Sequence, residues 1–224
     1  MKKFIITVIA LCISAITFAQ NPIEKNVGDF TEVKVYDRIV VNLVKSDENK
    51  VIISGEDASQ VNIVNKDGKL KIKMDLGLIF DGNRTFVHVY YSDLQIIDGN
   101  EGAVITSNEL IEQDRIEIKM QEGARVTVGL QVEEVDLRAV TGGIIEASGQ
   151  ATIQRVKVNT GGRYEGRELQ TETAEVFVQA GGEVEAYATK LADLTIRAGG
   201  DIDIYGNPAE VKRKRTFGGR IRIL

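Results

Sequence analysis

The sequence predicts an all-β protein that coils into a parallel β-solenoid of about seven rungs of ~20 residues each, preceded by a β-strand-rich N-terminal region. Three observations predict this fold. A glycine followed by glycine or alanine recurs at a nearly constant interval, an apolar residue precedes most of these glycines by five positions, and strand-like alternation resumes after them. The dipeptides are Gly102-Ala103, Gly123-Ala124, Gly142-Gly143, Gly161-Gly162, Gly181-Gly182, Gly199-Gly200 and Gly218-Gly219.

The positions five residues before the seven glycines form an apolar ladder that ends in a charge. Alternate side chains of a strand share a face, so this ladder predicts the inner face of the coil. Glycine suits the corners because it accepts positive φ without steric penalty and lets successive backbones stack closely. The final charge lies in "VKRKRTFGG", where we expect basic residues to protect an exposed sheet edge. The ladder is Ile97, Ile118, Leu137, Val156, Val176, Leu194 and Arg213.

The region before the repeat reads as short strands separated by turns. Residues 69–74 alternate lysine with apolar residues, which is the period of a half-buried strand, and "NKDGK" before them is typical of a hairpin turn. Residues 76–84 are expected to form a loop, and no helix is expected after the first 19 residues. The predicted organisation is one domain over residues 20–224, with N-terminal strands at 30–93 and repeated rungs at 94–224.

The first 19 residues predict a secretory signal peptide. Lys2 and Lys3 precede an apolar run that is too short to span a bilayer, and Ala19 is a small residue suited to the cleavage site. Cleavage removes Cys12, the only cysteine, so the mature chain is expected to form no disulfide. We therefore expect an exported protein that is periplasmic, exposed on the outer surface or secreted, with no transmembrane segment after cleavage.

Charge and composition disfavour several classes of function. Removal of the two lysines takes the formal charge from −5 to −7, whereas nucleic-acid binders are usually basic. The glycine corners are not followed by helices or by Lys-Ser/Thr, so they do not predict phosphate loops. His88 is the only histidine, which disfavours a zinc site and a serine-hydrolase base, and we expect it on the solvated face of a strand.

The most distinctive surface feature follows the fifth and sixth corners. If the rungs stack in register, four carboxylates and two tyrosines gather on one outer face. Clustered carboxylates suit calcium, and paired acids also suit glycosidic chemistry at separations of ~5 to 9 Å. The alternative is a charge ladder, in which Arg163 faces one acid and Arg220 and Arg222 face two others. The candidate residues are Glu183, Glu185, Tyr187, Asp201, Asp203 and Tyr205.

The chain resembles the head GIN domain family, which is labelled as auto-transporter adhesins. The resemblance covers residues 27–224 and depends on the F-x-x-V-x-V opening at Phe30, the glycine ladder and above all "DIDIYGNPAEV" at residues 201–211. Family members often carry serine beside the corner glycines, where this chain has threonine or alanine. The resemblance implies a secreted, right-handed β-helix-like protein of the bacterial envelope, with no catalytic residues to carry over.

These features together predict a non-enzymatic, exported protein of the cell envelope. We expect an adhesin or a binding and scaffolding module whose partner is a glycan or a cell-surface protein, with no cofactor unless calcium binds the acidic face. One alternative is a polysaccharide-active enzyme that uses Glu183, Glu185, Asp201 or Asp203. Another is a module that senses envelope stress.

Overall fold

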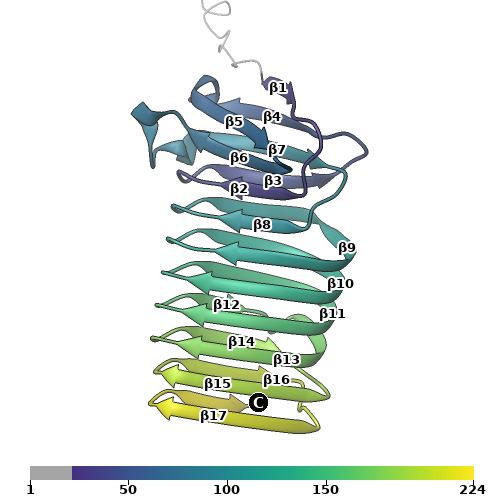
Figure 1. The fold of residues 1–224 in the computed structure, drawn as a ribbon, viewed down its shortest axis with the longest axis vertical. Coiled ribbons are helices and arrows are strands. Elements are labelled where there is room, and N and C mark those ends of the chain that lie inside the picture. The colour runs from purple at the N-terminus through teal and green to yellow at the C-terminus, as the bar shows by residue number, and fades with distance from the viewer. Residues whose placement is uncertain (1–21) are drawn as a thin grey trace, which may run out of the picture.

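A computed structural model describes residues 22–224, and the predicted signal peptide lies outside these residues. The described chain consists mainly of β-strands, with 67% strand and 4% helix (Figure 1). Within residues 22–224 no helix is long and apolar enough to cross a membrane. The strands are β1 (Ile23–Asn26), β2 (Glu32–Val35), β3 (Val40–Lys45), β4 (Lys50–Gly55), β5 (Val61–Lys66), β6 (Lys69–Met74), β7 (Thr85–Tyr91), β8 (Ile96–Gly99), β9 (Val104–Met120), β10 (Arg125–Val140), β11 (Ile144–Asn159), β12 (Arg163–Glu165), β13 (Leu169–Gln179), β14 (Glu183–Tyr187), β15 (Leu191–Ala198), β16 (Asp201–Tyr205), β17 (Glu210–Phe217) and β18 (Arg220–Ile223), and the short 3₁₀ helices are η1 (Ala58–Gln60), η2 (Leu76–Leu78) and η3 (Gly82–Arg84).

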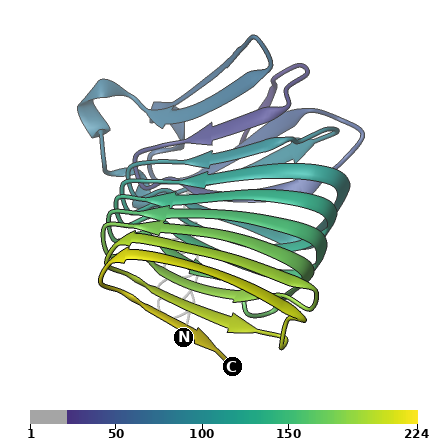
Figure 2. The ribbon, with the colours of Figure 1, turned by 60° about the horizontal axis from the view of Figure 1, so that its bottom comes forward.

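The chain winds into a flattened parallel β-solenoid of about seven turns, as the repeat predicts. Each turn has a strand that approaches the glycine corner, a strand that leaves it, and a bend that leads to the next turn. The corners align along one edge and the wider bends along the other (Figure 2). In β9, β10 and β11 the strand continues around the bend, so one long strand contributes to both faces. The solenoid therefore has two sheet faces. The strands that approach the corners form the pre-corner face, and the strands that leave the corners form the post-corner face.

The two residues of each dipeptide have different tasks at the corner. At the third corner, Thr141 and Gly142 have φ of 49° and 75°, and the Gly143 amide donates to the Val140 carbonyl at 2.9 Å. Two central residues with positive φ are the mark of a type I′ turn, which favours glycine. Gly143 instead has no space for a side chain, because a Cβ there would lie 2.1 Å from the Met120 carbonyl oxygen. The expected roles of glycine are thus confirmed and divided between the two positions.

The parallel stack extends above the first glycine corner. β2 and β3 form a coil that lies on β8 and β9, and their corner is Asp37-Arg38, with φ of 58° and 63°. β6 and β7 lie parallel to β2 and β3 on the other side, joined by residues 75–84. β4 pairs antiparallel with β1 and with β7, and β5 pairs antiparallel with β6. These antiparallel strands close this end of the stack. Because the Asp37-Arg38 corner contains no glycine, the glycine repeat does not predict these coils.

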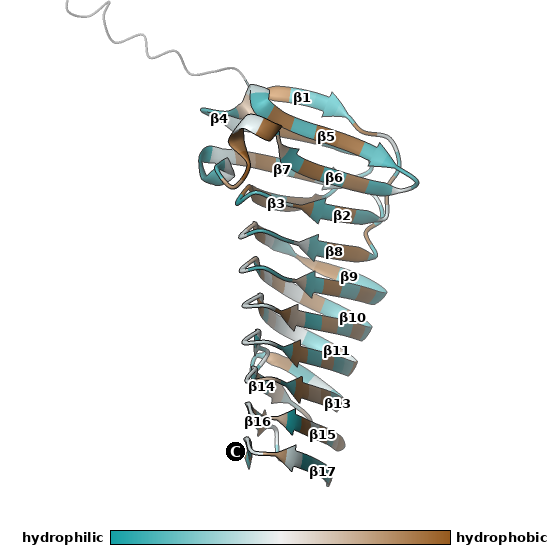
Figure 3. Cartoon of the chain, turned by 60° about the vertical axis from the view of Figure 1, so that its left-hand side comes forward, coloured by the Kyte–Doolittle hydropathy of each residue, from teal (hydrophilic) through white to brown (hydrophobic). Residues whose placement is uncertain are grey.

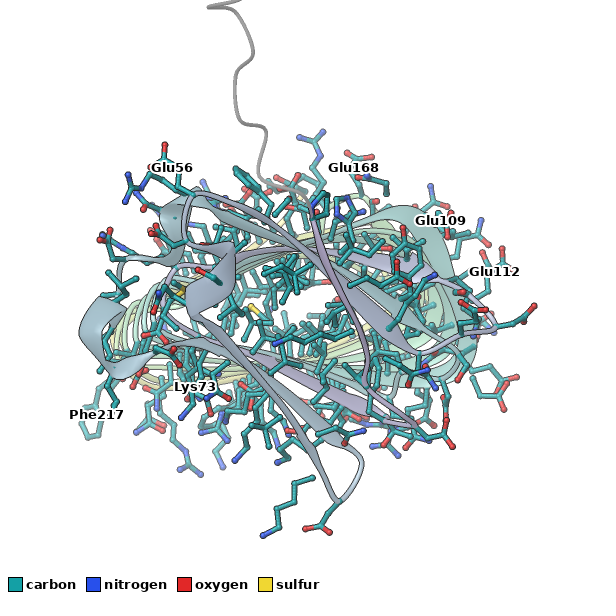
Figure 4. All side chains as sticks on the ribbon, turned by 90° about the horizontal axis from the view of Figure 1, so that it is seen from above. Glu56, Lys73, Glu109, Glu112, Glu168 and Phe217 are labelled. Atoms are coloured by element: carbon teal, nitrogen blue, oxygen red, sulfur yellow. The ribbon has the colours of Figure 1, made fainter. Side chains whose placement is uncertain are left out.

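The core is a continuous apolar column between the two faces. Every ladder position from Ile97 to Leu194 is buried, and apolar and polar residues alternate along the strands (Figure 3). In the last coil Arg213 and Arg215 are in register with Leu194 and Ile196 of the preceding coil, and both arginine side chains are exposed. Seen along the axis, side chains fill the interior, while charged ones such as Glu109 point outward at the bend (Figure 4). The expected charged edge strand at the end of the repeat is thereby confirmed.

One polar cluster interrupts the apolar core at the end of β14. The Tyr164 hydroxyl, fully buried, donates to Gln154 Oε1 at 2.8 Å, and burial raises its pKa. Gln154 Nε2 donates to the Thr171 hydroxyl at 2.9 Å and to the Tyr187 carbonyl at 2.8 Å. The Thr171 hydroxyl donates to the same carbonyl. Because β14 ends at Tyr187, these side chains supply the hydrogen bonds that this partly buried carbonyl requires.

Candidate binding face

The six candidate residues lie together on the post-corner face, on two consecutive coils. β14 and β16 pair in parallel with Glu183 opposite Asp201, Glu185 opposite Asp203, and Tyr187 opposite Tyr205. The side chains between them, including Val184 and Ile202, are buried in the core. The expected register is therefore confirmed, and alternation places all six side chains on the outer side of the sheet.

Arginines neutralise three of the four carboxylates. Arg163 Nη2 lies 2.9 Å from Glu183 Oε2, and Arg220 Nη2 lies 2.9 Å from Asp201 Oδ2. Arg222 binds both oxygens of Asp203, with Nε donating to Oδ1 at 2.5 Å. These are the three pairs that the charge-ladder interpretation predicts, and each arises because the rungs stack in register.

Asp203 is the most deeply held of the acids. It is 8% exposed, and a buried carboxylate requires a paired charge or several hydrogen bonds. The hydrogen bond with Asp203 is the largest cause that raises the pKa of Arg222. The pair with Arg222 is bidentate, which makes it geometrically specific. Asp203 is thus part of the structure of the last two coils.

Glu185 differs from its three neighbours. It is exposed, and within residues 22–224 no cationic side chain lies within ion-pair distance of it. It belongs to a row of four acids on successive coils, Glu146, Glu165, Glu185 and Asp203, in register across β11, β12, β14 and β16. The candidate residues predicted from the sequence came only from the last two coils of this row. The signal for the full row was the shared offset of three residues after each second glycine.

The two tyrosines are partly covered. The Arg167 guanidinium lies over the Tyr205 ring, 4.7 Å from its centroid, which is a cation–π arrangement. Tyr187 is half-buried, and its carbonyl is held by the polar cluster in the core. Neither ring is therefore a freely exposed platform.

The chemistry open to this face is limited by its own arginines. In residues 22–224 no three histidine, cysteine, aspartate or glutamate side chains are arranged to hold a metal ion. A calcium ion at the four acids would have to compete with Arg163, Arg220 and Arg222. His88, on β7, is exposed on a strand as expected.

Comparison with protein families gives one match. The family model described as "Putative auto-transporter adhesin, head GIN domain" matches residues 29–208. A search of curated proteins finds no match.

Solved structures with the same fold include proteins from Bacteroides fragilis and from two Parabacteroides species. A "putative adhesin" from Bacteroides fragilis superposes with a TM-score of 0.84 at 17% identity, over 91% of this chain and 96% of that one. A "putative adhesin" from Parabacteroides merdae gives 0.70 at 18% identity, covering 91% and 95% of the two chains. A "putative lipid binding protein" from Parabacteroides distasonis gives 0.69 at 19% identity, covering 92% and 97%. At these identities the likeness establishes the fold.

Proposed function

Because the chain belongs to the head GIN domain family, we propose that it is an exported, non-catalytic protein of the cell envelope that binds other surfaces in the manner of an adhesin. The adhesin names carried by the family and by two of the structural neighbours support this role. The predicted signal peptide supports export.

One observation carries the non-catalytic part of the proposal. Hydrolysis of a glycosidic bond requires a protonated carboxyl and a second, ionised carboxyl on either side of the bond. Glu183, Asp201 and Asp203 are instead engaged by guanidinium groups, which hold them as hydrogen-bond acceptors. Only Glu185 of the four is left without such a partner in the described residues. The face therefore supports a charge ladder better than an acid–base pair.

The proposal is tested with beads coated with the protein from residue 20 onward. We expect saturable attachment to intact bacterial or epithelial cells, and no release of reducing sugar when the same protein is incubated with a panel of polysaccharides. Beads coated with heat-unfolded protein are the control. A lack of attachment to every cell type would contradict the binding role. Release of sugar that is lost in Glu185→Gln would favour the enzyme instead.

Export needs its own measurement. We expect the protein in the envelope fraction or the medium of its native cells, with a mass that corresponds to cleavage after Ala19. An Ala19→Arg variant should block cleavage and leave the longer chain. Recovery of the full-length chain in the cytoplasm would contradict export.

A further inference from the structure

A second region of the post-corner face differs from the acidic row in chemistry. Near the N-terminal end of the stack, β4, β7, β3 and the first residues of β9 lie side by side in one continuous sheet. Ten of their outward side chains are uncharged, and we call these ten the neutral face. They are Val40, Asn42, Val44, Ile52, Ser54, Phe86, His88, Tyr90, Val104 and Thr106. Lys50, the first residue of β4 and in register with Tyr90, borders the neutral face and is paired with Glu24 at 3.1 Å and Glu48 at 3.2 Å.

Three ring side chains run along the middle of this face on one strand. Phe86, His88 and Tyr90 occupy alternate positions of β7, so their Cα atoms are about 6.6 Å apart at the usual rise of a strand. Phe86 is 48% exposed although it lies in a central strand, and His88 is exposed. Tyr90 is half-buried, with Lys50 Nζ 5.5 Å from the centroid of its ring. The strand thus presents a row of rings in which Phe86 is the most open.

Across β7, β3 and β9 the neutral face has an apolar, a polar and another apolar row, whereas on β4 Ser54 lies beside Phe86 and Ile52 beside His88. Phe86 is in register with Val40, and Tyr90 with Val44. Between them His88 is in register with Asn42, which is in turn in register with Thr106. The Thr106 hydroxyl lies 3.3 Å from Asn42 Oδ1. On these three strands hydrogen-bonding groups therefore form the middle row, with apolar and aromatic groups on both sides.

The side chains of the neutral face fit some classes of ligand better than others. Protein–protein interfaces bury an apolar centre inside a polar rim, which is the reverse order, so a second copy of the chain fits poorly. A cationic ligand finds no opposite charge among the ten side chains, and an anionic ligand would have to displace Glu24 and Glu48 from Lys50, the cation that borders them. Small molecules bind in concave pockets, whereas this is a sheet face. A neutral polysaccharide fits, because its sugar rings have apolar C–H faces beside uncharged hydroxyls.

We propose that the neutral face binds a neutral polysaccharide chain. Phe86, assisted by Tyr90, stacks against the C–H faces of the sugars, since aromatic rings supply a rigid apolar surface. Asn42 and His88 exchange hydrogen bonds with the hydroxyls. The inference rests on the proposed function of the protein as a surface-binding module and names both its ligand class and its site, which is distinct from the acidic row.

The test is affinity electrophoresis of the protein from residue 20 onward in gels that contain soluble glucan, mannan or galactan, with polyuronate and phosphatidylcholine vesicles as additional arms. We expect retardation by at least one neutral polysaccharide, a dissociation constant raised at least tenfold by Phe86→Ala, and a smaller increase with Tyr90→Ala. Phe217→Ala, which removes a 74% exposed phenylalanine from β17 at the far end of the stack, is the matched control and should bind normally. Urea unfolding establishes that each variant is folded.

The proposal is overturned if no neutral polysaccharide binds, if only polyuronate or vesicles bind, or if folded Phe86→Ala binds as well as the parent protein. Light scattering adds a further check, because a dimer that Phe86→Ala converts to a monomer would assign the face to self-association. Attachment of the same variants to cells separates the two proposals. If the parent protein and Phe86→Ala attach equally, the surface-binding function stands and the neutral face is not its site.

Discussion

The upper coils of the solenoid, formed by β6 to β9 with β2 and β3, and the lower coils, formed by β12 to β18, share a cross-section but differ in their corners and outer faces. Asp37-Arg38 and Glu101-Gly102 turn the upper corners, and the outer face beside them is neutral. In the lower coils the corners are turned by Thr160-Gly161, Ala180-Gly181, Gly199-Gly200 and Gly218-Gly219, and arginine–carboxylate pairs cover the face. Inward apolar alternation is common to both regions, whereas the corner residues and the outer residues differ between them.

The largest expected effect concerns the second corner position, which is alanine at Ala103 and Ala124 but glycine in the lower coils. At Gly162 a Cβ would lie 2.3 Å from the Ala139 carbonyl oxygen, so the backbones must separate. We expect Gly162→Ala to lower the free energy of unfolding in urea by about 3 kcal/mol, as in overpacked cores.

The neighbouring Gly161 is the matched control. It has positive φ, and no atom lies within 4 Å of the position that a Cβ would occupy, so Gly161→Ala strains only the backbone conformation. We expect a loss of about 1 kcal/mol. Equal effects at the two positions would show that close stacking does not distinguish them.

The next effect concerns the polar cluster, which has no counterpart in the coil above. Tyr164 is in register with Ile145, and Gln154 with Val135, so both occupy columns that are apolar in the preceding coils. Tyr164→Phe leaves Gln154 Oε1 without its donor, and we expect a loss of about 2 kcal/mol in urea unfolding. Tyr205→Phe removes a hydroxyl at the surface and should change stability by less than about 0.5 kcal/mol. A Tyr164→Phe variant as stable as the parent would mean that the cluster is dispensable.

The smallest effect concerns the acidic upper corner. Burial is the largest cause that raises the pKa of Glu101 above its ordinary value of 4.5, and the neighbouring Asp37 carboxyl is the next largest. A raised pKa means that the folded state binds the proton more tightly, so the stabilisation from Glu101 is complete below pH 4.5 and is lost as the pH rises through the folded value. Glu101→Gln should therefore stabilise the protein at pH 7 but not at pH 4.

Because Glu101 is partly exposed, solvent screening limits the gain at pH 7 to about 0.3 kcal/mol. Thermal melts at the two pH values measure the difference, and Glu112→Gln on the exposed bend is the control. If Glu101→Gln stabilises the protein equally at both pH values, the stabilisation has a cause other than the charge of the carboxyl group.

Much of the candidate site could be read from the sequence because the repeat has a fixed offset. Residues one and three positions after each second glycine face outward and stack on their counterparts, so the pairing of Arg163 with Glu183 and of Arg222 with Asp203 follows from counting. The full acidic row followed from the same offset but required four coils to be compared. The partial covering of Tyr205 by Arg167 could not be counted, because it depends on side-chain direction.

The sequence by itself determined the coil, since period, glycine corners and inward alternation are local properties that each rung repeats. It also determined the register of the lower coils, because every rung there follows the previous one along the chain. Only the tertiary structure decided the N-terminal end, where β2 and β3 lie between β8–β9 and β6–β7 out of sequence order. The neutral face exists only there, because its side chains come from strands that are distant in sequence and adjacent in the sheet.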